Sequence, residues 1–167
     1  MSPAEDRFEQ TLTSGRLKAV YAAWKVLSDG RVGPRRAEVK PAHLRRDTPW
    51  TFTVDVLDGG KDFRCGFAGD RLMQFLDRDC RAPTLGGLKG NHFFDEAGKL
   101  FLRCVTSRKP VASGPKPTSY TGKEHLEREV LLLPLSEDGT TVTGLLGAFD
   151  TWRLGTHPHS TAPVVAD

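Results

Sequence analysis

The sequence predicts an α+β fold with a five-stranded antiparallel sheet, helices on one face of that sheet and a further helix at the N-terminus. Two segments, 51–58 and 62–69, alternate apolar and polar residues around Asp58-Gly59-Gly60, which is typical of a β-hairpin. Apolar residues recur every three or four positions in 14–28 and in 95–107, which indicates two amphipathic helices. Continuous apolar runs such as 131–133 indicate strands that are covered on both faces.

The composition is that of one folded domain. The chain has 167 residues, of which 38% are apolar and 27% charged, and its formal net charge is +3 at pH 7. This mild charge argues against a protein that coats nucleic acid. Cys65, Cys80 and Cys104 form no CxxC pair and are expected to be free thiols in a reducing compartment. No apolar run reaches the ~18 residues of a membrane span and no signal peptide is evident, so we expect a cytoplasmic protein.

Residues 1–30 form the first predicted unit, an N-terminal flanking helix. Residues 1–13 are polar and expected to be frayed, and the helix is predicted to run from an N-cap at Ser14 to a stop at Asp29-Gly30. Its large apolar side chains fall on one stripe, which must cover either the chain's own sheet or a second copy. We expect this stripe to form a homodimer interface through Leu17, Val20, Tyr21, Trp24 and Leu27.

Residues 31–49 form a basic, proline-rich connector. Three prolines interrupt any long element. The segment contains six basic residues but only two acidic ones, Glu38 and Asp47, which is a local excess of four positive charges. Such a segment can contact phosphates, but this one has neither interleaved aromatic residues nor the pattern of a recognition helix. We therefore interpret it as a solvated connector or as a surface for an acidic partner, and expect no nucleic-acid partner.

Residues 50–153 form the predicted core domain, and residues 154–167 a flexible tail. After the hairpin, Asp70 is expected to begin a short helix, and Asp95 to cap the longer helix, which Pro110 terminates. Glu127 and Glu129 alternate with other residues near a strand end, a pattern that favours a solvent-exposed face. The three further strands are expected at 111–120, 125–135 and 141–152.

This order of elements, together with four stretches of sequence, resembles the PAS domain family. The stretches are LKAVYAAWKVLSDGR, GPRRAEVKPAHL, FAGDRLMQFLDRD and LLLPLSEDGTTVTGLLGA, and the resemblance covers about residues 17–153. They are similar to those of a divergent bacterial subgroup of stand-alone PAS proteins. The resemblance implies a sheet in the spatial order 2-1-5-4-3, with helices between the second and third strands. It also implies a sensory or regulatory module in signalling, although the fold alone does not identify a ligand.

The residues depart from the PAS classes that carry a known cofactor. Flavin-photosensing members have an Asn-Cys-Arg-Phe-Leu-Gln stretch where this chain reads LDRDCRAPTL. Haem-binding members usually have a histidine ligand on the long helix, where EAGKLFLRCVTSR has none. We therefore expect neither flavin nor haem. The sequence also shows no paired nucleophile and base, no metal-ligand set and no GxGxxG loop, so we expect no enzymatic activity and no metal site.

The strand and helix periods predict an apolar pocket between the sheet and the 95–107 helix. Such a lining favours a small, mainly apolar ligand, and Gly66, Gly144 and Gly147 are expected to leave room for it. The residues expected to line the pocket are Cys65, Phe67, Phe75, Leu88, Phe94, Phe101, Cys104, Leu132 and Leu145.

Two functions are consistent with these features. The first is a sensory or regulatory PAS module that binds a small apolar ligand or a protein partner and acts through contacts with an unidentified signalling protein. The alternative is a ligand-free module for protein interaction and dimerisation, with a filled core. A cavity with a bound molecule distinguishes the first from the second.

Overall fold

The computed structural model describes residues 3–77, 84–88, 90–156 and 164–166. Its strands pair antiparallel in one sheet of order β2-β1-β5-β4-β3-β6. The predicted α+β class and the five-strand order 2-1-5-4-3 are confirmed, and a short sixth strand extends the sheet beyond β3. The strands are β1 (Thr51–Leu57), β2 (Asp62–Ala68), β3 (Val111–Pro117), β4 (Leu126–Leu135), β5 (Gly144–Arg153) and β6 (Val164–Val165).

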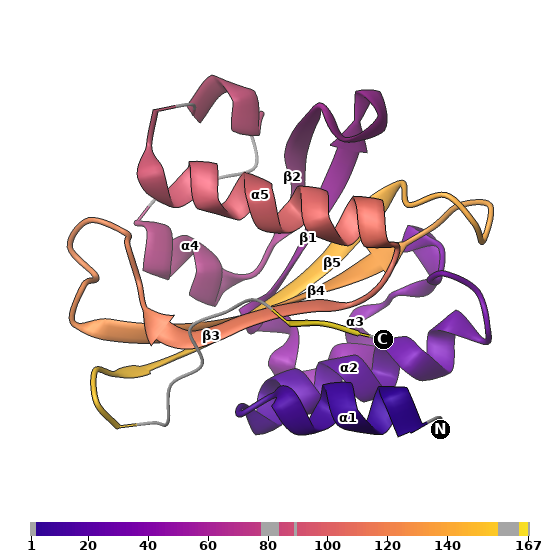
Figure 1. The fold of residues 1–167 in the computed structure, drawn as a ribbon, viewed down its shortest axis with the longest axis horizontal. Coiled ribbons are helices and arrows are strands. Elements are labelled where there is room, and N and C mark those ends of the chain that lie inside the picture. The colour runs from indigo at the N-terminus through magenta and orange to yellow at the C-terminus, as the bar shows by residue number, and fades with distance from the viewer. Residues whose placement is uncertain (1–2, 78–83, 89, 157–163, 167) are drawn as a thin grey trace.

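Helices cover both faces of the sheet, so the molecule has three layers (Figure 1). On the inner face lie α4 (Asp70–Leu76), the 3-10 turn η4 (Leu85–Leu88) and α5 (His92–Ser107). On the outer face lie α1 (Pro3–Thr11) and α2 (Gly15–Ser28). The remaining short helices are η1 (Arg36–Glu38), α3 (Pro41–Leu44), η2 (Arg45–Trp50) and η3 (Asp58–Gly60).

Side-chain caps explain where the long helices begin. Ser14 caps α2 as predicted, because its hydroxyl accepts a hydrogen bond from the Leu17 backbone N–H at 3.2 Å. The predicted cap of the longer helix was wrong: α5 begins at His92, three residues before Asp95. Asn91 is the cap, since its side-chain oxygen accepts from the N–H groups of Phe93 and Phe94.

The apolar stripe of α2 packs against the chain's own sheet. Leu17, Val20 and Tyr21 are fully buried and Trp24 is 7% exposed, in one cluster with the outer-face residues of β4 and β5. The indole Nε1 of Trp24 donates to the Pro134 carbonyl oxygen at 2.8 Å, which ties α2 to β4. The expectation that this stripe forms a dimer interface is therefore corrected for these four side chains, while Leu27 is half-buried.

The N-terminal segment is also part of the core, contrary to the expectation of a frayed end. Phe8 and Leu12 are each only 2% exposed, and both belong to the outer cluster. The Phe8 ring meets the Tyr21 ring edge-on, with 5.2 Å between centroids. The segment is polar on average, but its two buried apolar residues pack in the same cluster as the apolar stripe of α2.

Part of the predicted flexible tail is paired with the sheet. Val164 and Val165 pair antiparallel with Ala112 and Val111 at the outer edge of β3. The predicted edge strand is thus covered by the end of the chain. Among the residues that the structure describes, no helix combines the length and apolar character needed to cross a membrane.

Candidate ligand-binding site

A cavity of about 140 Å³ lies between the inner face of the sheet and the layer of α4, η4 and α5. Its walls are mainly apolar and strongly aromatic, with two charged residues, Glu96 and Arg128. It is lined by Phe52, Val54, Phe63, Cys65, Leu72, Phe75, Leu76, Leu85, Leu88, Phe93, Phe94, Glu96, Ala97, Leu100, Phe101, Arg128, Val130, Leu132 and Phe149.

Most of the predicted lining residues come together at this cavity. Cys65 reaches it from β2, Phe75 from α4 and Leu88 from η4. Phe94 and Phe101 reach it from α5, and Leu132 from β4. The period-two and period-3.6 patterns therefore placed these side chains on the correct faces.

Phe67 does not line the cavity, and its side chain is 42% exposed. The cause is an irregularity in the pairing of β1 with β2, where Val54 faces Cys65 but Phe52 faces Ala68. Between these pairs β1 advances two residues and β2 three, so the alternation of β2 side chains reverses after Cys65. The prediction assumed an unbroken alternation and so placed Phe67 on the wrong face.

Cys104 and Leu145 were also predicted to line the cavity, but they lie in the packed core beside it. Both are fully buried in the cluster of apolar side chains on the inner face of the sheet. The Cys104 Sγ lies 3.3 Å from the Lys109 carbonyl oxygen and 3.7 Å from that of Leu132. Burial raises the pKa of this thiol well above its usual range, so it is an inert core group rather than a reactive one.

The three glycines expected to leave room for a ligand do not do so, because neighbouring atoms lie where their side chains would be. A Cβ built on Gly147 would lie 2.1 Å from the Phe52 ring, and one on Gly66 would lie 2.2 Å from the Arg36 guanidinium. A Cβ on Gly144 would lie 3.1 Å from the Val54 carbonyl oxygen. The cavity volume therefore arises elsewhere, between the aromatic rings of the sheet and those of the helices.

The sequence reasoning missed an aromatic cluster at one end of the cavity. Phe75, Phe93 and Phe149 line the cavity, and Tyr120 packs against Phe75 and Phe93 with centroid distances of 5.7 and 4.9 Å. The Tyr120 hydroxyl donates to the Leu76 carbonyl oxygen, which ties the loop after β3 to α4. Phe149 is in register with Val130 on β4, and that register could have identified it.

The charged residues of the cavity were missed as well. Arg128 lies two residues before Val130 and four before Leu132, so strand alternation places all three on the inner face. Glu96 lies on the first turns of α5, where its Oε2 accepts from the Ser119 hydroxyl at 2.9 Å. The His92 Nε2 lies 3.2 Å from Glu96 Oε1, so the long helix does carry a histidine, at its exposed first residue.

Glu127 and Glu129 are fully buried on the opposite face, which corrects the prediction of a solvent-exposed face. The two Glu129 oxygens accept hydrogen bonds from the backbone N–H groups of Thr13 and Ser14, each at 2.8 Å. Burial raises the pKa of Glu129, although these two hydrogen bonds oppose the shift. Glu127 accepts from the Gly155 N–H at 2.9 Å. Both carboxylates therefore bind backbone at the start of α2 and after β5.

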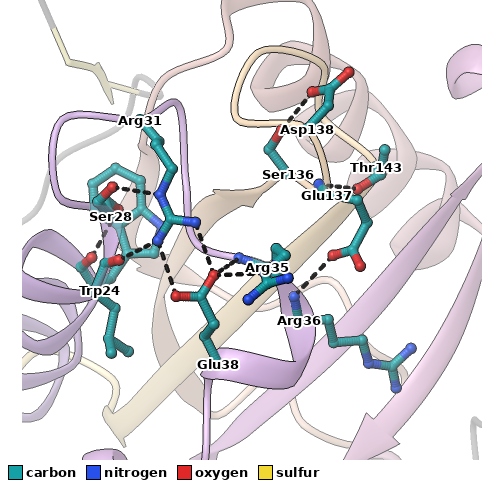
Figure 2. Close-up of polar contacts among 11 residues, drawn as sticks. Trp24, Ser28, Arg31, Arg35, Arg36, Glu38, Ser136, Glu137, Asp138 and Thr143 are labelled. Carbon is teal, nitrogen blue, oxygen red and sulfur yellow. Dashed lines mark hydrogen bonds and ion pairs between the residues drawn. The ribbon is translucent and has the colours of Figure 1, made fainter.

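Three of the six basic side chains of the connector form ion pairs within the chain, namely Arg31 and Arg35 with Glu38 (Figure 2) and Arg36 with Asp55. Arg31 donates to both Glu38 oxygens, at 2.8 and 3.0 Å, and to the carbonyls of Leu27 and Ser28. These bonds, with the Arg35 backbone N–H, hold the pKa of Glu38 at about 2. Arg36 forms an ion pair with Asp55 at 2.6 Å. The connector thus joins the end of α2 to the sheet.

Cys80, considered a free thiol, lies outside the described residues. Within the described ranges, no group of three or more His, Cys, Asp and Glu side chains is placed to hold a metal ion.

A protein-family model described as "PAS domain" matches residues 12–150. The chain therefore belongs to the PAS domain family, whose fold agrees with the sheet order and the inner-face helices described above. PAS domains are generally sensory or regulatory modules rather than catalysts. Neither the curated proteins nor the solved structures contain a match to this chain.

Proposed function

We propose that this PAS domain is a sensor that binds a small, mainly apolar molecule between the sheet and α5 and transmits its presence through contacts with a separate signalling protein. The observation that supports ligand binding is the cavity itself. Protein interiors are packed to the density of organic crystals, and voids larger than a water molecule are few in each domain. An apolar, aromatic-lined cavity of about 140 Å³ between the sheet and α5 is a volume that a ligand would explain.

The test is to fill the cavity without changing its surroundings. Ala97 lies on α5 and lines the cavity, so Ala97→Phe would place a ring in the space a ligand needs. The matched control is Ala22→Phe, which adds the same ring at an exposed position of α2. Molecules extracted from the purified wild-type chain are identified by mass spectrometry and titrated back onto all three proteins.

The expected result is one copurified apolar molecule that binds the wild type and Ala22→Phe but not Ala97→Phe. Filling an empty cavity restores lost packing contacts, so Ala97→Phe is expected to unfold at the same or a higher denaturant concentration. If Ala97→Phe binds the molecule as well as the wild type does, the cavity is not its site and the sensor function is wrong.

The alternative function is a ligand-free module for protein interaction and dimerisation. The observation in its favour is Phe67, a large apolar side chain exposed on β2 at the end of the sheet. A homodimer remains a prediction, but it needs another surface than the buried stripe of α2. A dimer that forms with the same dissociation constant in wild type and Ala97→Phe, with no copurified molecule, would favour this alternative.

The remaining features of the proposal rest on the sequence and on the resemblance to PAS proteins. We expect it in the cytoplasm of a bacterium, without flavin, haem or nucleic acid, and without turnover of its ligand. Its output would then depend on a partner that senses a change in the layer of α4 and α5, which covers the inner face of the sheet (Figure 1).

A further inference from the structure

One wall of the cavity carries a cation whose hydrogen-bonding capacity is only partly used. The Arg128 Nη1 donates to the Ser113 carbonyl oxygen at 3.0 Å and to the Ser113 hydroxyl at 3.2 Å. Among the residues that the structure describes, its Nε and Nη2 have no hydrogen-bond partner and no carboxylate is ion-paired with it. Since a guanidinium offers five N–H donors, several remain for a group inside the cavity.

A second cation stands beside the first. Lys116 on β3 is the direct cross-strand partner of Arg128 on β4, so two positive side chains face the same side of the sheet. Like charges directly opposite one another destabilise a sheet. Burial lowers the pKa of both groups, and in Lys116 the charge of Arg128 lowers it further, while the negative charge of Glu96 opposes the shift in each.

One carboxylate, that of Glu96, attracts both cations and offsets part of their charge. Glu96 lines the cavity, but one of its oxygens accepts from the Ser119 hydroxyl and the other lies 3.2 Å from His92 Nε2. Within the described chain neither Arg128 nor Lys116 forms an ion pair with Glu96, so the sheet side of the cavity keeps a positive excess.

We infer that the ligand of this cavity is an amphipathic carboxylate, with its apolar body among the aromatic rings and its carboxylate on Arg128. This inference rests on the proposed sensor function and adds the chemical class of the ligand. The planar fork of a guanidinium matches a planar carboxylate, and Lys116 adds a second positive charge close by. A cavity of about 150 Å³ accommodates benzene in another protein, so a body of one ring or a short chain fits the 140 Å³ found here.

The test compares acids with neutral molecules of the same shape. Phenylacetate, hexanoate and octanoate are each titrated onto the full chain by calorimetry, beside phenylacetamide, hexanamide and octanamide. The same titrations are run on Arg128→Met, which keeps an apolar stem but loses the charge. Arg103→Met, on the exposed face of α5, is the matched control.

At least one acid is expected to bind the wild type about tenfold or more tightly than its amide, because hydrogen bonds between charged groups are the stronger ones. Arg128→Met should remove that preference, and Arg103→Met should keep it. If the amides bind as well as the acids, or if Arg128→Met keeps the preference, the carboxylate is wrong while the sensor function stands. If no probe binds but a neutral copurified molecule is displaced by Ala97→Phe, the ligand class is again wrong and the site is right.

Discussion

The ring of Phe52 occupies the space that a side chain at Gly147 would need. The two residues are cross-strand partners in β1 and β5, and a Cβ on Gly147 would lie between 2.1 and 2.6 Å from three atoms of that ring. Phe52 is also a wall of the cavity and lies 6.4 Å, centroid to centroid, from Phe101. Because Gly147 has no side chain, the Phe52 ring can lie over it and form one wall of the cavity.

Gly147→Ala is expected to destabilise the fold by about 1–3 kcal/mol, because the Phe52 ring must leave its position. The displaced ring would enter the cavity, so ligand binding should weaken as well. Gly15→Ala is the control, since a Cβ there meets nothing within 4 Å. Denaturant unfolding measures the stability, and an unchanged midpoint for Gly147→Ala would contradict the prediction.

Regular periodicity made much of this fold predictable. The stripe of α2 and the positions of the strands follow from these patterns, whereas the five-strand order was implied by the resemblance to the PAS domain family. Sequence reasoning was wrong where one local feature interrupts a pattern, as at the irregular β1–β2 pairing that turns Phe67 outward. The sequence holds one signal of that irregularity, Gly66 next to Cys65, because a glycine inside a strand often marks a bulge.

Two further differences came from judging residues by polarity rather than by position. Glu127 and Glu129 share the alternation of Leu131 and Leu133, so their face is the one that α1 and α2 cover. Arg128 shares the alternation of the cavity residues for the same reason. The strand period is consistent with all three charges facing inward, but the rarity of buried charged residues favoured an exposed face for Glu127 and Glu129.

Trp24→Ala is expected to destabilise the single chain by about 3–5 kcal/mol, because a buried indole and its bond to the Pro134 carbonyl are both lost. Val26→Ala is the control on the same helix, since Val26 is 79% exposed, and it should change stability by no more than ~0.5 kcal/mol. Unfolding is measured at two protein concentrations. A loss of stability in Trp24→Ala that depended on concentration would indicate that Trp24 acts across a dimer instead.

The ion pair between Arg31 and Glu38 should make the free energy of unfolding depend on pH in the acid range. The pKa of Glu38 falls from 4.5 to about 2 in the folded chain, mainly through its hydrogen bonds from Arg31. A lowered folded pKa means that the contribution is present above about pH 4.5 and is lost as the pH falls toward 2. Glu38→Gln should therefore be less stable than the wild type at neutral pH, and the difference should shrink over that range.

The measurement for Glu38 is the denaturant midpoint of wild type and variant across the acid range. Glu124→Gln, at an exposed turn, serves as the control for removing a carboxylate and should follow the wild type. A difference between Glu38→Gln and wild type that stays constant down to pH 2 would show that the ion pair with Arg31 does not carry the effect.

Glu129→Ala should loosen the junction of α1 and α2 from the sheet. The carboxylate of Glu129 accepts from the N–H groups of Thr13 and Ser14, and the second of these is buried at the start of α2. An unsatisfied buried N–H costs about 1–3 kcal/mol, so a loss of that order is expected. Glu129→Gln keeps one acceptor oxygen and should lose less. Hydrogen exchange of the Thr13 and Ser14 amides measures the local effect, with Glu124→Ala as the exposed control. Exchange of these two amides that is as slow in Glu129→Ala as in the wild type would show that other contacts hold the N-terminal helices in place.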